Sequence, residues 1–343
     1  MKTNRRDFLK FAGAALVAGA AGTMLTGSDA LAGAGLGAGG KVKQGEPPKG
    51  MTFLTISKNG EYSLGVKTNK GILDVKAASA LFKKKVPTTI DDVIQGGDQG
   101  LTALVKTALK SDKAKGVFLE ESKIQFGPCV TNPEKILMLG FNYRQHAMET
   151  GTPIPTSPVL FTKTNNTLNC HNGTIKLPTH VGTKFDHEVE LVVVMGKTAY
   201  RVSEQDALKY VFGYCTGNDF SARDLQRKTS QFLLGKNSDG FAPIGPYLVT
   251  ADQIPDPNNL KLECYINGER RQSNNTKDMI FNVATIISYA SQHWTLKPGD
   301  MFFTGTPEGV IFGKPVDKQV WLKAGDKVTT VVEKLGELKF SLT

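Results

Sequence analysis

The sequence has only four cysteines and two tryptophans, and it has no long hydrophobic segment. Four of its 343 residues are cysteine and no two of them form a Cys-x-x-Cys pair, which argues against zinc-ribbon and thioredoxin-like sites. Aromatic residues make up 8% of the chain and are not interleaved with a dense Lys/Arg run. We therefore expect no nucleic-acid partner.

The rest of the composition is that of a folded globular protein with an excess of positive charge. Hydrophobic residues make up 40% and charged residues 22%, both ordinary values for a globular chain. The formal net charge of +10 favours anionic partners. Because the basic residues are scattered along the chain, a solvated surface or a small acidic metabolite accounts for this charge as well as a nucleic acid would.

The N-terminus has the order of a secretory signal. The paired Arg5 and Arg6 precede an Ala/Gly-rich apolar run, and Ala30 to Ala32 provide an A-x-A-like cleavage site. This pattern predicts a cleaved twin-arginine signal over residues 1–32 and an exported, periplasmic protein that meets the membrane only through this signal. The alternative is an uncleaved anchor, but the apolar run is shorter than the roughly 20 residues that span a bilayer.

The remainder divides into a linker and two folded parts. Residues 33–50 are rich in Gly, Ala, Lys and Pro and predict a flexible linker. Residues 51–127 hold three short strand patterns and two helical ones, which predict a small N-terminal α+β domain. In residues 128–343 strand patterns outnumber helical ones and no βαβ alternation with a glycine-rich phosphate loop is present. We therefore predict a β-dominated α+β fold for this larger domain.

Three acidic residues form the strongest candidate site. Glu188 and Glu190 lie two apart at the start of the apolar run Leu-Val-Val-Val-Met, so on a strand they face the same way. Two neighbouring carboxylates need a neutralising partner, and oxygen ligands favour Mg²⁺, Mn²⁺ or Ca²⁺ over zinc. A solvated edge strand is the alternative. Asp219 follows another apolar run, where it is either a third ligand or a turn and helix-cap residue.

Other candidates have equally plain alternatives. His146 and Glu149 lie three residues apart, so on a helical turn the carboxylate orients the imidazole and raises its basicity. Such a pair also occurs commonly on surfaces. Lys236 lies in a polar, Gly-flanked loop, where it is suited to holding a carboxylate or an oxyanion. Thr306 lies in a Gly/Pro turn after an apolar strand. Each of these segments is also compatible with an ordinary turn.

Seven motifs in order resemble the fumarylacetoacetate hydrolase superfamily. The resemblance extends over almost the whole of residues 135–343, and residues 51–127 resemble the small N-terminal domain of longer members. The motifs are GFNYRQH (140–146) with Glu149, PVLFTK (158–163), HEVELVVVMGK (187–197), GYCTGNDFSARDLQ (213–226), GKNSDGFAPIGP (235–246), LKPGD (296–300) and FTGTPEGV (303–310).

The resemblance implies a role for each matching position. It assigns Glu188, Glu190 and Asp219 to Mg²⁺, and His146 with Glu149 to the activation of water. Lys236 matches the lysine that stabilises an enolate or oxyanion. Thr306 and Arg223 fall in motifs that border the substrate pocket in relatives. The resemblance also implies a β-roll catalytic domain and a homodimer.

These assignments lead to a functional hypothesis. We expect a Mg²⁺-dependent hydrolase that cleaves a carbon–carbon bond in an acylpyruvate-type 2,4-diketo acid, which is a small anionic 2-oxo acid. The alternatives are an isomerase or tautomerase acting on 2-hydroxyhepta-2,4-diene-1,7-dioate and a 2-oxo-acid decarboxylase. A non-enzymatic alternative is an exported protein that only binds 2-oxo acids.

Overall fold

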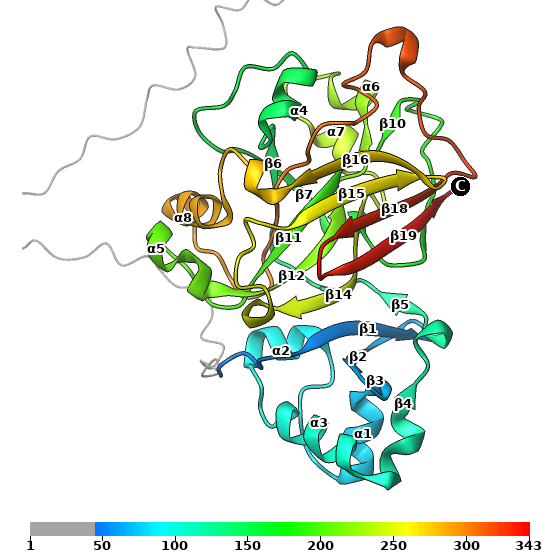
Figure 1. The fold of residues 1–343 in the computed structure, drawn as a ribbon, viewed down its shortest axis with the longest axis vertical. Helices are drawn as coiled ribbons and strands as arrows, with labels where there is room; N and C mark the ends of the chain where they lie inside the picture. The colour runs from blue at the N-terminus through cyan, green and yellow to red at the C-terminus, as the bar shows by residue number, and fades with distance from the viewer. Residues whose placement is uncertain (1–44) are drawn as a thin grey trace, which may run out of the picture. The chain divides into compact units, whose positions relative to one another are not determined.

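Two β-sheets form the core of residues 45–343, which is the part of the chain that the computed structural model describes (Figure 1). The predicted signal over residues 1–32 and the first twelve residues of the predicted linker, 33–44, lie outside the described residues. The larger sheet has twelve strands, and its main path runs β4-β3-β2-β1-β14-β12-β11-β17-β6-β7. The smaller sheet has five strands in the order β16-β15-β18-β19-β9. The predicted β-dominated α+β class is confirmed.

The strands and helices have the following bounds. The strands are β1 Thr52–Lys58, β2 Glu61–Thr68, β3 Gly71–Asp74, β4 Phe118–Leu119, β5 Phe126–Gly127, β6 Ile136–Gly140, β7 Val159–Lys163, β8 Leu168–Asn169, β9 Gly173–Ile175, β10 Phe185–Asp186, β11 Val189–Met195, β12 Val211–Asn218, β13 Ser221–Ala222, β14 Ala242–Thr250, β15 Lys261–Ile266, β16 Glu269–Asn275, β17 Met301–Phe303, β18 Lys327–Val332 and β19 Gly336–Leu342. The helices are α1 Val75–Phe82, α2 Ile90–Gly96, α3 Leu101–Lys110, α4 Arg144–Glu149, α5 Glu204–Ala207, α6 Arg223–Gln226, α7 Leu233–Lys236 and α8 Val283–His293.

Strand β11 is covered on both faces, which explains its uninterrupted apolar sequence. It lies between β12 and β17 in the larger sheet. Leu191 and Val193 belong to one hydrophobic cluster with residues of β15, β18 and β19, whereas Val192 and Val194 belong to another. Polar side chains at the start of this strand are therefore buried rather than solvated.

The predicted N-terminal strands continue the larger sheet. β1 pairs with β14 in antiparallel fashion, with Thr52 opposite Val249, and helices α1 to α3 pack beside β1 to β4 (Figure 1). In the same view α4, α6 and α7 gather near the opposite end of the fold. The described residues, 45–343, all belong to one compact unit, and the predicted domain boundary at 127/128 stays a prediction.

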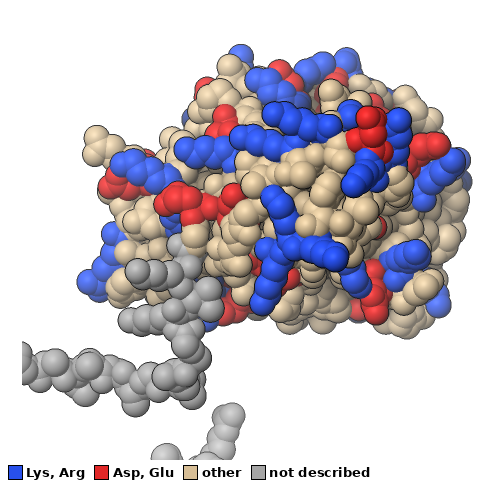
Figure 2. All heavy atoms as spheres, turned by 90° about the horizontal axis from the view of Figure 1, so that it is seen from below, with Lys and Arg blue, Asp and Glu red and all other residues tan. Residues whose placement is uncertain are grey.

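The surface carries its positive charge in separate groups. Figure 2 shows lysine and arginine side chains over the face seen from below, with acidic and uncharged residues between them. Within the described residues, no helix is both long enough and apolar enough to cross a membrane. All four cysteines are free, and Cys129, Cys215 and Cys264 are buried.

Asn142 ties the segment before α4 to two other parts of the fold. Its side chain is fully buried; Nδ2 donates to the carbonyls of Thr304 (2.7 Å) and Phe281 (3.0 Å), and Oδ1 accepts from the Phe281 N–H (2.9 Å). This asparagine of the GFNY motif thus fixes the approach of the segment before α4 to the turn that follows β17.

Asn142→Ala is expected to lower the free energy of unfolding by about 3 kcal/mol, because three backbone groups lose a hydrogen-bond partner, one of them buried and the other two part-buried. Urea unfolding followed by circular dichroism measures this change. Asn69→Ala, on the exposed turn between β2 and β3, is the control and should change the stability by less than about 0.5 kcal/mol. Equal midpoints for the two variants would contradict the role given to Asn142.

Candidate active site

Three carboxylates converge where β11 begins and β12 ends. Glu190 lies in β11, Glu188 directly precedes that strand, and Asp219 directly follows β12. The pairing of Val189 with Asn218 brings the two strand ends together, and the Asp219 N–H donates to the Glu188 carbonyl at 2.9 Å. One carboxylate oxygen from each residue lies within 4.8 Å of the others. The solvated-edge alternative for this pair is wrong, because Glu188 is 4% and Glu190 1% exposed.

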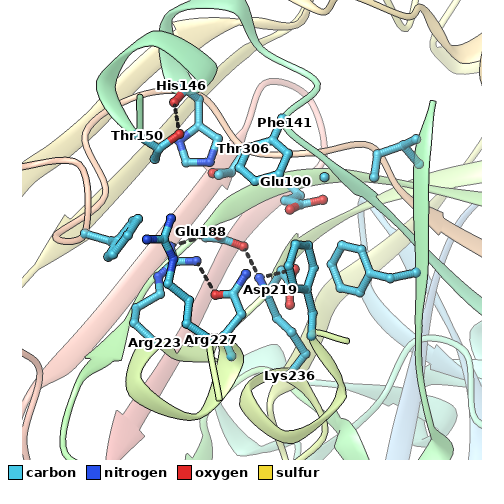
Figure 3. Close-up of a pocket in the computed structure, with 16 residues that line it drawn as sticks. Phe141, His146, Thr150, Glu188, Glu190, Asp219, Arg223, Arg227, Lys236 and Thr306 are labelled. Atoms are coloured by element: carbon cyan, nitrogen blue, oxygen red, sulfur yellow. Dashed lines mark hydrogen bonds and ion pairs between the residues drawn. The ribbon is translucent and has the colours of Figure 1, made fainter. Parts of the chain in front are cut away.

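Two of the three carboxylates are already paired with buried cations. Lys236 Nζ, at the end of α7, bridges Glu188 Oε2 (2.6 Å) and Asp219 Oδ2 (2.7 Å) (Figure 3). Lys163 Nζ, at the end of β7, lies 2.7 Å from Asp219 Oδ1, and burial lowers the pKa of this lysine to about 8. Burial opposes ionisation of Glu188, but Arg223 and Lys236 hold its pKa well below the usual range.

Glu190 is the carboxylate without a cationic partner among the described residues. Its one hydrogen bond comes from the Gly305 N–H at 2.7 Å. Burial, together with the neighbouring charges of Asp219 and Glu188, raises the pKa of Glu190 well above its ordinary value. A cation placed between the three carboxylates would remove this penalty, and carboxylate oxygens are ligands that hard divalent ions prefer. The buried acidic trio is therefore suited to a divalent metal ion.

His146 and Glu149 of α4 form a hydrogen-bonded pair beside the carboxylates. His146 Nδ1 lies 2.8 Å from Glu149 Oε1, and the other carboxylate oxygen accepts the Gly309 N–H at 2.9 Å. The His146 ring points into the pocket (Figure 3). Phe141 stacks on it with the ring centroids 6.2 Å apart, and Phe141 has a left-handed backbone (φ 54°). A residue of this type rarely adopts that conformation except where the surroundings impose it.

The loop after β17 closes the site from the other side. Thr306 Oγ1 donates to the Val189 carbonyl (2.9 Å) and accepts from Gln272 Nε2 (2.9 Å), so its hydroxyl is held by the protein itself. Gly309 has a φ of 101°, and an added Cβ there would lie 2.3 Å from the Arg271 carbonyl oxygen. Only glycine fits this position, and its N–H is the one that holds Glu149.

Arg223 forms ion pairs with two carboxylates in the structure. Its Nε lies 2.9 Å from Asp186 Oδ2 and its Nη2 2.6 Å from Glu188 Oε1. Asp186 also accepts the N–H groups of Ile311 and Phe312. Arg223 therefore joins the loop after β17 to a candidate metal ligand, while it still lines the pocket.

Seven of the eight residues singled out in the sequence line one cavity of about 60 Å³, and Glu149 lies behind His146. The seven are His146, Glu188, Glu190, Asp219, Arg223, Lys236 and Thr306. Asp186, Lys163 and Arg227 were not singled out. Asp186 lies two residues before Glu188, so strand alternation gave a signal for it. The sequence signal for Lys163, the lysine that ends the apolar segment PVLFTK, is weaker.

The chain is similar to known proteins over most of its length. Residues 135–343 match the family model described as the C-terminal domain of fumarylacetoacetate (FAA) hydrolase. The chain is 44% identical over 237 residues to a 2,4-didehydro-3-deoxy-L-rhamnonate hydrolase of Sphingomonas sp. (strain SKA58), which covers 69% of this chain and 82% of that protein. It is 39% identical over 270 residues to a mitochondrial oxaloacetate tautomerase of Xenopus laevis, which covers 78% of this chain and 81% of that protein.

Solved structures give the same result. A fumarylacetoacetate hydrolase from psychrophilic Exiguobacterium antarcticum superimposes with a TM-score of 0.70 at 30% identity, over 85% of this chain and 99% of that chain. A maleylpyruvate hydrolase from Sphingobium sp. SYK-6, in complex with manganese(II) and pyruvate, superimposes with a TM-score of 0.68 at 27% identity, over the same shares of the two chains.

Proposed function

The chain belongs to the fumarylacetoacetate hydrolase family, and from this premise we propose that it is a Mg²⁺-dependent hydrolase of an acylpyruvate-type 2,4-diketo acid. The observation that carries the proposal is the His146–Glu149 pair, whose imidazole faces a pocket that also holds three buried carboxylates. A protein that only bound 2-oxo acids would have no need of an oriented base.

The charges around the site support an anionic substrate together with a divalent cation. Four buried carboxylates, those of Asp186, Glu188, Glu190 and Asp219, are matched by three buried cations, Lys163, Arg223 and Lys236. With all four carboxylates ionised, a divalent ion held by Glu188, Glu190 and Asp219 would change the sum of these charges from −1 to +1. A substrate with one carboxylate would then bring it to zero. Mn²⁺ or Ca²⁺ would satisfy the same donors as Mg²⁺.

Each of the chain's own groups has a place in the hydrolysis. When bound, Mg²⁺ supplies Lewis-acid polarisation of the substrate's 2-oxo and carboxylate oxygens. His146 takes a proton from water at Nε2, and Glu149 stabilises the imidazolium that forms. The hydroxide adds to the distal carbonyl carbon, the bond between that carbon and C3 breaks, and its electron pair moves onto pyruvate as an enolate. Lys236 offsets the enolate charge until C3 is protonated. The products are pyruvate and a carboxylic acid.

Oxaloacetate tautomerisation is the second candidate. It is favoured by the 39% identity to the Xenopus laevis enzyme of that name. The same imidazole would move a proton between C3 and the enol oxygen, and no water would be consumed. Arg223 and Thr306 are proposed to border the bound substrate in either reaction. Arg223 would also position Glu188, and Thr306 would position the loop after β17.

A matched pair of assays decides between these reactions. The purified protein with Mg²⁺ is given an acylpyruvate and, separately, enol-oxaloacetate, and both are followed by loss of the enol absorbance and by chromatography of the products. We expect pyruvate and the cognate carboxylic acid in equal amounts from the acylpyruvate, and no product when a chelator is present. Fast ketonisation of oxaloacetate without any acylpyruvate cleavage would replace hydrolysis by tautomerisation. If neither compound is turned over, the remaining hypothesis is a protein that only binds 2-oxo acids.

Two further proposals come from the sequence. Export through a twin-arginine signal rests on Arg5 and Arg6, and N-terminal sequencing of the exported form should begin near Gly33. A homodimer rests on the family resemblance, and sedimentation velocity of the purified protein measures it directly.

A further inference from the structure

Arg227 is a cationic residue of the pocket that has no carboxylate partner among the described residues. Three Lys or Arg side chains line the cavity. Arg223 is bound to Asp186 and Glu188, and Lys236 to Glu188 and Asp219. Arg227 makes no ion pair or side-chain hydrogen bond in the described chain, and its one recorded side-chain contact is with the ring of Phe312, 4.3 Å from the guanidinium carbon.

The position of Arg227 is fixed, although its guanidinium forms no ion pair within the described residues. It is the residue directly after α6, and its backbone N–H donates to the Leu225 carbonyl. Arg223 at the start of the same helix also lies over the Phe312 ring, at 5.7 Å, and Figure 3 places both arginines on one side of the pocket. Stacking on an aromatic face holds a guanidinium in one plane while its N–H groups stay available to an acceptor.

The residues that line the rest of the cavity are mostly uncharged, so the charge of Arg227 is available to a ligand. Apart from the acidic trio and its cations, the lining is largely apolar and includes Leu139, Phe141, Phe161, Phe232 and Phe312. The cavity is small, about 60 Å³, so a 2-oxo acid whose oxo-acid end lies at the carboxylates must extend its other end toward the exposed rim. Arg227 is exposed and belongs to that rim.

We propose that Arg227 binds a second carboxylate, at the distal end of the substrate, so that the preferred substrates are dicarboxylic 2-oxo acids. This inference rests on the proposed function, because it takes the acidic trio as the place where the 2-oxo-acid end binds. A planar guanidinium binds a carboxylate by donating two parallel hydrogen bonds, and no carboxylate of the described residues forms an ion pair with Arg227. A neutral acyl chain would gain nothing from this group.

Binding of unreactive 2-oxo acids tests the proposal without any turnover. Calorimetry of the Mg²⁺-loaded full chain compares 2-oxoglutarate with 2-oxopentanoate, and 2-oxoadipate with 2-oxohexanoate, each pair differing in carboxylate against methyl. We expect the wild type to prefer the dicarboxylate about tenfold in at least one pair, the scale of one charge-assisted bidentate contact near solvent. Arg227→Gln should lose this preference and bind the monocarboxylates as before. Arg227→Lys should keep part of it.

Lys228→Gln is the matched control, because it removes the same charge from the adjacent exposed position, which does not line the cavity. It should keep the wild-type preference. The proposal is overturned if the wild type shows no preference in either pair, if Arg227→Gln retains it, or if Lys228→Gln loses it equally. A purely structural role of Arg227 against Phe312 would weaken both members of a pair alike.

Turnover gives the second measurement. If acylpyruvates are cleaved, kcat/KM for succinylpyruvate should fall about tenfold in Arg227→Gln, mainly through KM, and that for butyrylpyruvate should stay the same. Absence of any cleavage by the wild type, with the binding preference intact, would contradict the proposed hydrolysis and leave the distal carboxylate site standing.

Discussion

Replacing Glu190 by glutamine is expected to abolish divalent-metal binding and, at the same time, to stabilise the metal-free protein. Glu190 is the member of the acidic trio that has no cationic partner among the described residues, and its pKa is raised by burial and by Asp219 and Glu188. Glutamine keeps an oxygen for the Gly305 N–H but carries no charge. The metal would lose a charged carboxylate ligand. The metal-free fold would lose the repulsion between Glu190 and the carboxylates of Asp219 and Glu188.

The stabilisation has a defined sign with pH. A carboxyl group whose pKa is raised by folding takes up a proton in the folded state, so its contribution to stability is present at low pH and is lost as pH rises above about 4.3, the ordinary value for glutamate. The difference in the free energy of unfolding between Glu190→Gln and the wild type should therefore increase from that pH upward. At pH 7 it can reach about 4 kcal/mol, the cost of protonating a glutamate of ordinary pKa.

Thermal unfolding with chelator and with Mg²⁺ measures both effects, and calorimetry gives the metal affinity directly. At 100 times its Kd, Mg²⁺ should stabilise the wild type by about 2.7 kcal/mol and leave Glu190→Gln unchanged. Glu61→Gln, an exposed acid on β2, should behave as the wild type. A Mg²⁺-dependent rise in Tm that survives in Glu190→Gln would remove this residue from the metal site.

Glu188 should behave in the opposite way in the metal-free protein. It pairs with Arg223 and Lys236, both buried, so Glu188→Gln leaves two desolvated cations with one carboxylate partner each. Breaking buried ion pairs costs about 3 kcal/mol or more. Two changes that look alike in the sequence, two residues apart at the start of β11, thus have effects of opposite sign on stability.

This difference marks the limit of what the sequence predicts. Strand alternation is local, so it predicted that Glu188 and Glu190 share a side, and the short N-terminal strand patterns lie within a residue or so of β1 to β3. Which carboxylate receives a cation depends on Lys163, Arg223 and Lys236, which come from β7, α6 and α7. Nothing local in the sequence determines those contacts.

Helix α8 illustrates a second limit. Its buried residues Val283, Ile286, Ile287 and Ala290 have helical spacing, and Asn282 caps it by accepting the Thr285 N–H. The expectations from the sequence include no helix over these residues. Several of these residues are β-branched and favour strands when read singly. The helical spacing of the buried residues and the Asn282 cap outweigh this preference of single residues for strands.

His146→Ala is expected to lower kcat by about 10² to 10⁴, the usual scale for loss of a general base, and to leave Mg²⁺ affinity almost unchanged. The imidazole lines the pocket but is not a member of the acidic trio. Met148→Ala is the control on the same helix, because that side chain is 62% exposed and does not line the pocket. Steady-state kinetics and Mg²⁺ titration of the same preparations separate the base from a structural role. Loss of metal binding in His146→Ala would make the histidine structural, and an unchanged kcat would remove its role as base.

Glu149→Gln should be nearly as damaging, although glutamine has the same shape. The carboxylate uses one oxygen for His146 Nδ1 and the other for the Gly309 N–H, and glutamine has only one acceptor oxygen. If that oxygen keeps Gly309, the amide NH₂ faces Nδ1 and forces the proton onto Nε2, which removes the base from the atom that faces the pocket. If the oxygen keeps His146, the NH₂ opposes the Gly309 N–H and the loop after β17 is pushed away. Either outcome lowers kcat, and only the second also lowers the stability. Near-wild-type activity in Glu149→Gln would show that Glu149 does not set the protonation of His146.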